Sequence, residues 1–429
     1  MGFPEISPMP PVAGGVGLPW DLPVDNAVDT LARARTDHGD TFVVDSGDDR
    51  YLFTFSPQGV SAFYALTEDK AAKGVADWRM LRRKIPDEVF VGRRTLPHEL
   101  FGREDVACYL ANVDRALDST FEEMGSGGAV DVFDLTRRLG HRIGMASWGG
   151  PGSADGPVFS QLALAFDTLD GSDSFVHPDA MAAVTASGKA AERAALQQVG
   201  QLLGCAIDLL AGSEGDHPLF SRIVSAWADE SGEAMRIGVA HDVVLLHIAS
   251  MSNLFAALGW ALVDLVDNPQ AQPSVLGGDR ARTEQCMLES IRLAQRSIMA
   301  RYVLAPVEFS DGVTRYDVAP GITIATLLPL TNTTAAPGLD KWNPDRWNRR
   351  RLADGSGLAA TELVTAFGHG RHTCPAQPFS LAAMTTAVIR LLSRFELEPG
   401  WVGRPGPVPA QIGGVARAAD PCPLTYRLR

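Results

Sequence analysis

The sequence is poor in cysteine, and this scarcity limits the kinds of protein it can encode. Its 429 residues include five cysteines, which lie far apart and form no C-x-x-C pair: Cys108, Cys205, Cys286, Cys374 and Cys422. Such spacing excludes the dense disulfide framework of small secreted domains. Each cysteine therefore has to be interpreted alone.

Basic residues are also scarce, because 38 lysines and arginines face 51 acidic residues and leave a net charge of −13. This balance argues against nucleic acid or an anionic membrane as a partner. No uninterrupted run of about 18 apolar residues occurs. The start, MGFPEISPMPPVAGG, lacks the basic-then-apolar order of a signal peptide. We expect a soluble, cytoplasmic protein that acts on small molecules.

The sequence pattern changes twice along the chain, and no clear linker separates the three regions. Residues 1–100 hold a Pro-rich lead, a helix in VDNAVDTLARARTDHG and a hairpin in TFVVDSGDDRYLFTF. Residues 100–300 read as long helices, among them AVTASGKAAERAALQQVGQLLGCAIDLLAG. Residues 300–429 hold short β-type pieces, a Pro/Trp-rich stretch and the helical LAAMTTAVIRLLSRF. This pattern predicts one domain over 1–429, mainly α with a small β region.

One stretch, AFGHGRHTCPAQPFS at 366–380, concentrates residues that can carry chemistry. Cys374 precedes a helical run, where unpaired N–H groups stabilise a thiolate. Gly368 and Gly370 let the backbone turn sharply and approach something flat or bulky. These features favour a cofactor-binding loop.

The residues alone leave three interpretations of this stretch open. His369, His372 and Cys374 are possible zinc ligands, although no second ligand cluster has good spacing. A catalytic Cys/His pair needs only proximity in space, but it leaves the two glycines unexplained. A buried structural cysteine on a glycine turn is the plainest alternative.

The stretch resembles the haem-binding loop of the cytochrome P450 family, F-x-x-G-x-x-x-C-x-G. Phe367, Gly370 and Cys374 fall on this pattern, and His372 matches a residue that bonds a haem propionate. Ala376 stands where the family usually has glycine. The resemblance implies that Cys374 ligates the iron of haem b through its thiolate.

Three further family features occur in the expected order. Glu289 and Arg292 in LESIRLAQRS form the E-x-x-R pair, one helical turn apart. Arg346 in NPDRW resembles the third member of that charge network, and Arg301, twelve residues after Glu289, matches a second propionate-binding arginine. The resemblance covers essentially the whole chain and implies a single helical prism with haem between a long central helix and the cysteine loop. It leaves open which residue of the 70–110 region binds a propionate.

The central helix departs from the family. HIASMSNLFAALGWALVDLVDNP places Ala249 and Ser250 at the A/G-G positions, Ser252 at the acid and Asn253 at the threonine that help activate dioxygen in the family. Helical spacing puts Ala249, Ser250 and Asn253 on one face towards the haem. His247 points elsewhere and is expected to be a satisfied core or surface histidine.

Ser252 and Asn253 do not titrate near neutrality, so the carboxylate-fed proton relay of the family is missing. One hypothesis is therefore a haem-thiolate isomerase, lyase or cyclase that opens an activated O–O or N–O bond, in specialised metabolism. The alternative is a conventional monooxygenase that uses O2 and receives electrons from ferredoxin and ferredoxin reductase. A third is a non-catalytic binding protein, which the presence of Cys374 disfavours.

The substrate expected from the resemblance is a lipophilic small molecule, and the protein is expected to be a monomer. The family builds its pocket from segments near 74–100 and 150–185, which here contain Trp78, Phe90, Phe166 and Phe175. Scattered aromatics are also ordinary core residues. The arginines of WNRRRL, at 349–351, are a possible docking patch for an acidic redox partner or simply a solvated surface.

Overall fold

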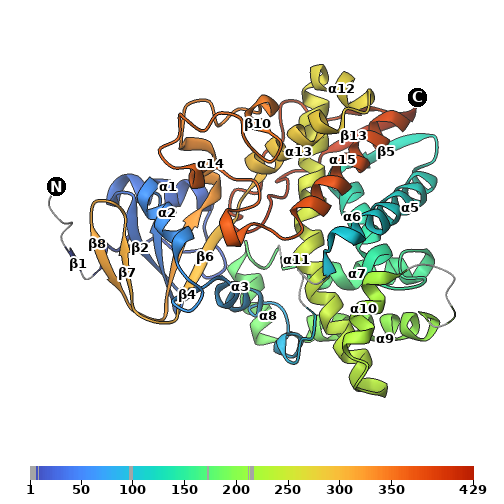
Figure 1. Cartoon of the computed structure of the whole chain (residues 1–429), viewed down its shortest axis with the longest axis horizontal. Helices are drawn as coiled ribbons and strands as arrows, with labels where there is room; N and C mark the ends of the chain where they lie inside the picture. Colours follow the sequence, from blue (N-terminus) through green and yellow to red (C-terminus); the bar gives the residue numbers. More distant parts are fainter. Residues whose placement is uncertain (1–5, 8, 96–99, 172, 211, 213–216) are drawn as a thin grey trace.

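The computed structural model describes residues 6–7, 9–95, 100–171, 173–210, 212 and 217–429. A β-rich part gathers on one side of the molecule and a larger body of helices on the other (Figure 1). Part of the 70–110 region, residues 96–99, lies outside the described residues. The fold is mainly α with a small β region, as the sequence predicts.

The β-rich part starts with the predicted helix and hairpin. Helix α1 (Ala27–His38) begins where the Asn26 side chain caps its first turn and ends at Gly39, whose φ of 89° suits glycine. Strands β2 (Thr41–Ser46) and β3 (Asp49–Thr54) pair antiparallel. The confirmed hairpin then joins a larger sheet.

This five-stranded sheet brings distant parts of the chain together. Its order is β2-β3-β9-β6-β4, with β9 (Ile322–Leu327) parallel to β3, and with β6 (Ile298–Val303) between β9 and β4 (Ala71–Ala72). Smaller sheets join β1 (Ile6–Ser7), β8 (Arg315–Val318) and β7 (Val307–Ser310), and also β12 (Phe395–Pro399), β13 (Pro423–Leu428) and β5 (Gly127–Asp131). Strand β6 thereby fixes Arg301 beside residues 63–72.

Helix α11 (Gly232–Asp267) is the axis of the helical body, and most of its residues are buried. It packs against α6 (Val132–Trp148), α9 (Ala190–Leu210), α13 (Arg280–Ala294) and α15 (Gln377–Arg394) (Figure 1). By length and composition α11 is apolar enough to cross a membrane, although its sequence is not one uninterrupted apolar run. Its burial identifies it as a core helix.

The sequence predicts a single helix from Ala183 through Gly212, and this prediction is wrong. The structure has two helices, α8 (Pro178–Ala186) and α9, separated where Gly188 and Lys189 adopt φ angles of 61° and 60°. Such angles break a right-handed helix, and glycine makes the break inexpensive. The predicted segment YVLAPVEF is likewise divided between β6 and β7.

The remaining elements complete the two parts: α2 (Pro57–Ala65), α3 (Lys73–Leu81), α5 (Val106–Met124), α7 (Gly156–Leu169), α10 (Pro218–Ala226), α12 (Gln272–Leu276), α14 (Leu328–Thr334), β10 (Trp347–Asn348) and β11 (Arg351–Leu352). The main core lies between the helices around α11, and a second core lies between α1 and the sheet.

Candidate active site

The cysteine loop is a tight turn that leads into helix α15. The N–H of Cys374 donates to the carbonyl of Phe367 at 2.8 Å and closes the turn. Gly368 has a φ of 83°, and a Cβ there would lie 2.7 Å from the carbonyl oxygen of His372. Helix α15 begins at Gln377, three residues after Cys374. The loop therefore presents the thiol at a helix start.

The surroundings of the Cys374 thiol act on its pKa in opposite directions. Burial raises the pKa, whereas the backbone N–H groups of Ala376 and Gln377 and the charge of Lys73 lower it. Burial has the larger effect, so the free thiol keeps its proton at neutral pH. A bound cation would favour the thiolate, because metal ligation releases the proton.

The two histidines of the loop have other partners than the sulfur. His369 Nε2 lies 3.1 Å from the Val364 carbonyl, and its ring meets Tyr64 edge to face. His372 Nε2 lies 2.8 Å from Arg301 Nη1. In the described part of the chain, no histidine, cysteine, aspartate and glutamate side chains form a group of three that suits a metal ion. Neither a zinc site nor a Cys/His pair is supported by this geometry.

Arg301 is fully buried beside the loop and holds several acceptors at once. Its Nε donates to the Ala71 carbonyl at 2.8 Å, and its Nη2 lies 2.9 Å from Glu68 Oε1. Burial lowers the pKa of His372, and the charge of Arg301 acts in the same direction. Arg301 and His372, both proposed from the sequence as propionate ligands, therefore lie together.

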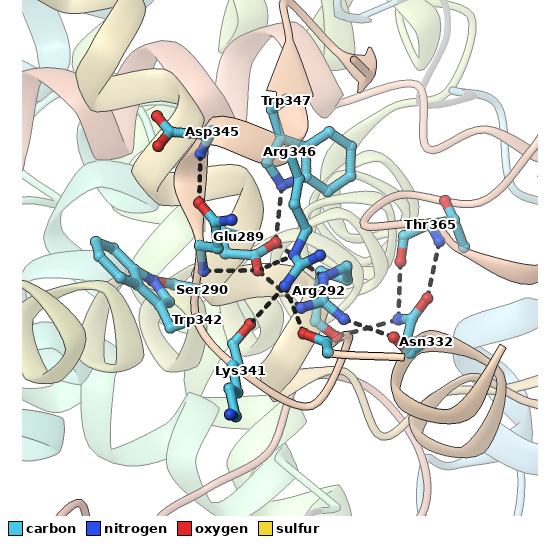
Figure 2. Close-up of polar contacts among 12 residues, drawn as sticks. Glu289, Ser290, Arg292, Asn332, Lys341, Trp342, Asp345, Arg346, Trp347 and Thr365 are labelled. Atoms are coloured by element: carbon cyan, nitrogen blue, oxygen red, sulfur yellow. Dashed lines mark hydrogen bonds and ion pairs between the residues drawn. The ribbon is translucent and has the colours of Figure 1, made fainter. Parts of the chain in front are cut away.

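Glu289, Arg292 and Arg346 also meet, in a buried network that Figure 2 shows. Arg292 donates to both carboxylate oxygens of Glu289 at 2.8 Å, and Arg346 Nε donates to Oε1 at 3.0 Å. Trp347 Nε1 adds a further bond at 2.9 Å. No role for Trp347 was predicted from the sequence.

The same network reaches the cysteine loop through helix α14. Arg292 Nη1 donates to the Asn332 carbonyl, and the Asn332 side chain exchanges two hydrogen bonds with the backbone of Thr365 (Figure 2). Thr365 Oγ1 in turn donates to the Gly368 carbonyl at 3.0 Å. The charge network thus positions the start of the cysteine loop.

The four α11 residues that the sequence singled out, together with Ile248, interrupt the buried surface of the helix. Ala249 and Asn253 are exposed and Ser250 and Ser252 are half-buried, although most of the surrounding helix is buried. Ala249, Ser252 and Asn253 line a cavity of about 240 Å³, whereas Ser250 is not part of its wall. Asn253 Oδ1 accepts a hydrogen bond from the Val415 N–H at 2.9 Å. The side chain of Ser252, not that of Ser250, completes this face.

The rest of the cavity wall comes from distant segments. Of the aromatic residues expected there, only Phe175 lines it. Phe166 stacks on His247 in the core, Phe90 packs against the same core, and Trp78 is 38% exposed under Arg82. Met80 and Asp170 line the cavity from the two segments, 74–100 and 150–185, where the pocket was expected. The sequence interpretation missed Trp20 and Val415, because no local pattern marks them and each comes from a distant part of the chain.

His247 lies in the core, in a hydrogen-bonded chain across three helices. Trp148 Nε1 donates to His247 Nδ1 at 3.2 Å, so His247 Nε2 carries the proton that His141 Nδ1 accepts at 2.8 Å. His141 Nε2 then lies 2.9 Å from Asp167. Burial holds the pKa of His247 well below its usual range. His247 is thus a satisfied core histidine, as expected.

A haem fits the residues that surround the loop. The Cys374 sulfur receives N–H groups without a histidine partner, and Arg301 and His372 offer donors suited to carboxylates. The small side chains of Ala249 and Ser252 on α11 form part of the cavity wall. These residues suit a haem that is held through a cysteine thiolate.

Comparison with known proteins finds a matching family model in the C-terminal third of the chain. The cytochrome P450 family model matches residues 279–421, which include the charge network and the cysteine loop. Over 214 residues the chain is 25% identical to human 24-hydroxycholesterol 7-alpha-hydroxylase, covering 43% of each chain. It is 24% identical to the cytochrome P450 monooxygenase hepE of Aspergillus oryzae over 49% of this chain and 42% of that protein. It is 29% identical to tryptamine 5-hydroxylase of Oryza sativa subsp. japonica over 36% of this chain and 33% of that protein.

Over residues 279–421 the chain therefore carries the sequence pattern of the cytochrome P450 family, and its relatives include a named cytochrome P450 monooxygenase. Its matches to these relatives span less than half of their lengths.

Proposed function

We propose that the protein is a haem-thiolate oxidoreductase that acts on a lipophilic small molecule. Cys374 would hold the iron of haem b, while His372 and Arg301 would bind its propionates and Phe367 and Gly370 would shape the loop. The observation that carries this proposal is the half-buried Cys374 thiol, which accepts hydrogen bonds from two backbone N–H groups and lies close in the chain to the His372 that pairs with Arg301. A bound haem supplies redox chemistry at its iron.

The charge network has a supporting role in this proposal. Glu289, Arg292 and Arg346 fix the segment that ends in Thr365, so contacts within the protein hold the start of the loop. The cavity beside α11 would receive the substrate, because apolar side chains such as Met80, Phe175 and Val415 form much of its wall.

For the reaction, we infer hydroxylation by a monooxygenase route that uses O2 and external electrons. The names of the relatives, two hydroxylases and a monooxygenase, support this inference. Asn253 would act as a hydrogen-bonding group, since its Oδ1 is held by Val415 while its Nδ2 can donate into the cavity. Asp170 adds a carboxyl group to the same wall and lies 3.6 Å from Arg137.

A second candidate reaction rests on the residues of α11 themselves. Ala249, Ser250, Ser252 and Asn253 bring no titratable group to this face of the helix, so general acid help, worth about 10²–10⁴-fold, is missing there. Opening an activated O–O or N–O bond, with rearrangement or cyclisation in specialised metabolism, needs no such help.

We also propose a docking surface for an electron donor near the arginines at 349–351. Arg350 pairs with Glu284 at 3.2 Å, and the three arginines line a hollow with α13 residues. Their positive charge suits an acidic ferredoxin, itself reduced by ferredoxin reductase. The protein would work as a cytoplasmic, single-domain monomer over 1–429, with neither nucleic acid nor membrane as a partner.

The first experiment tests the cofactor. Purified holoprotein is reduced under carbon monoxide, and the thiolate-type spectrum is expected. Cys374→Ser should abolish this spectrum, and the exposed Cys205→Ser is the matched control that should retain it. A wild-type protein without the thiolate spectrum would contradict the proposed function.

The second experiment separates the two reactions. Wild type and Asn253→Thr are given 24-hydroxycholesterol with ferredoxin, its reductase and NADPH, or a linoleic acid hydroperoxide without any reductant. The monooxygenase proposal predicts product only with reductant and tighter oxygen coupling in Asn253→Thr. Turnover of the hydroperoxide without electrons, and no reductant-dependent product, would favour the second candidate.

A further inference from the structure

The hydrogen bonds of Arg301 determine which nitrogen of His372 carries the proton. A guanidinium can only donate, so the 2.8 Å contact between Arg301 Nη1 and His372 Nε2 makes Nε2 the acceptor. The imidazole then carries its hydrogen on Nδ1. Among the residues that the structure describes, no hydrogen-bond acceptor is found for this Nδ1–H.

Most N–H groups of the Arg301 guanidinium already have an acceptor within the protein. Of its five N–H groups, Nε bonds the Ala71 carbonyl, and Nη1 bonds the Phe63 carbonyl and His372. Nη2 bonds Glu68 Oε1, which leaves one N–H. Arg301 is therefore mainly a scaffold for His372.

Glu68 supplies the carboxylate that completes this scaffold. Its Oε1 lies 2.9 Å from Arg301 Nη2, and its Oε2 accepts a hydrogen bond from the Lys73 N–H at 3.1 Å, where helix α3 starts. The 3.5 Å contact between Oε1 and His372 Nε2 is not a hydrogen bond, because the lone pair of Nε2 already faces Arg301. Both oxygens of Glu68 are thus tied to groups other than the histidine.

We infer that Glu68 is a positioning residue for the haem carboxylates. It fixes Arg301 so that His372 keeps Nδ1–H, and it leaves that N–H and one Nη2–H of Arg301 for a propionate. This inference rests on the proposed function and adds Glu68 to it. Glu68 has no counterpart among the site residues expected from the sequence.

The test compares Glu68→Gln with Glu396→Gln, because the two carboxylates are matched. Their side chains are 47% and 45% exposed, and each lies 2.9 Å or less from an arginine nitrogen. Each holoprotein is mixed with excess apomyoglobin, and haem transfer is followed by absorbance. Glu68→Gln should lose haem about threefold to tenfold faster, the scale of a half-exposed charged hydrogen bond. Glu396→Gln should match the wild type.

A second haem distinguishes positioning from general support of the fold. With protoporphyrin IX iron dimethyl ester, which has no charged carboxylates, Glu68→Gln should lose haem at the wild-type rate. Equal acceleration for both haems would mean that Glu68 only stabilises the local fold, and this would overturn the inference. Unchanged or slower loss of ordinary haem would overturn it too, since slower loss indicates competition with the propionate. A wild type that binds no haem would instead refute the proposed function.

Discussion

Replacing His247 with leucine removes the middle member of a buried hydrogen-bonded chain that joins α6, α7 and α11. The substitution leaves the Trp148 Nε1–H without its acceptor and His141 Nδ1 without its donor. Each unpaired buried group costs about 1–3 kcal/mol. We therefore expect the free energy of unfolding to fall by about 2–6 kcal/mol, with leucine recovering a little through apolar burial.

Urea unfolding of the holoprotein, followed by far-ultraviolet circular dichroism, measures this loss. The control is His177→Leu, an exposed position where we expect a change within about 0.5 kcal/mol. Adding Trp148→Phe to His247→Leu removes one of the orphaned groups, so the double variant should be less destabilised than the two single losses together. The hydrogen-bonded chain would be refuted if the losses in the free energy of unfolding of the two single variants simply added up in the double variant. It would also be refuted if His247→Leu lost as little as the control.

Three further predictions follow from other parts of the molecule. Burial lowers the pKa of His241 and, more strongly, of His247, so the unfolded chain binds more protons below about pH 6.5. The contribution of these histidines to the free energy of unfolding should therefore be fully present above that pH and should decline towards pH 5. Urea titrations at several pH values measure it, and a free energy of unfolding that does not change with pH would contradict this prediction. Glu289→Gln breaks a fully buried ion pair and should lower the free energy of unfolding by about 3–5 kcal/mol in the same assay. A loss below about 1 kcal/mol would show that the charge network contributes little to stability. Gly414→Ala would place a Cβ 2.7 Å from Asn253 Oδ1 at a φ of 63°, so it should displace that side chain and change the Soret shift caused by lipophilic ligands; an unaltered ligand spectrum would count against the contact.

Local and contiguous features of the site could be predicted from the sequence. The cysteine loop is one short stretch, and Glu289 and Arg292 are one helical turn apart, so spacing alone brings these residues together. Arg346 and Arg301 required the resemblance to a family, because nothing local links them to Glu289 or to His372. The fold class followed from long apolar helical patterns, but the break at Gly188 and Lys189 did not.

Helical spacing also could not decide between Ser250 and Ser252. At about 100° per residue, both serines lie about 80° from the line midway between Ala249 and Asn253, on opposite sides. Which of them faces the cavity depends on the neighbours of α11. The cavity lies on the side of Ser252, and this information comes from loops such as the one that carries Val415.

Glu68 and Asp170 could not be predicted for a related reason. Neither belongs to a motif in its own segment, and each meets its arginine partner only in the folded chain. Arg301 lies 233 residues from Glu68. A contact of this kind leaves no periodic or motif signal.

The five-stranded sheet has a consequence for the timing of cofactor uptake. Because β6 sits between β4 and β9, Arg301 can reach the carbonyls of Phe63 and Ala71 only after both segments have been synthesised and paired. Cys374 is made later still. A nascent chain on the ribosome thus cannot assemble the complete set of groups for haem before residue 374 has emerged, and haem uptake becomes a late event in the synthesis of the chain.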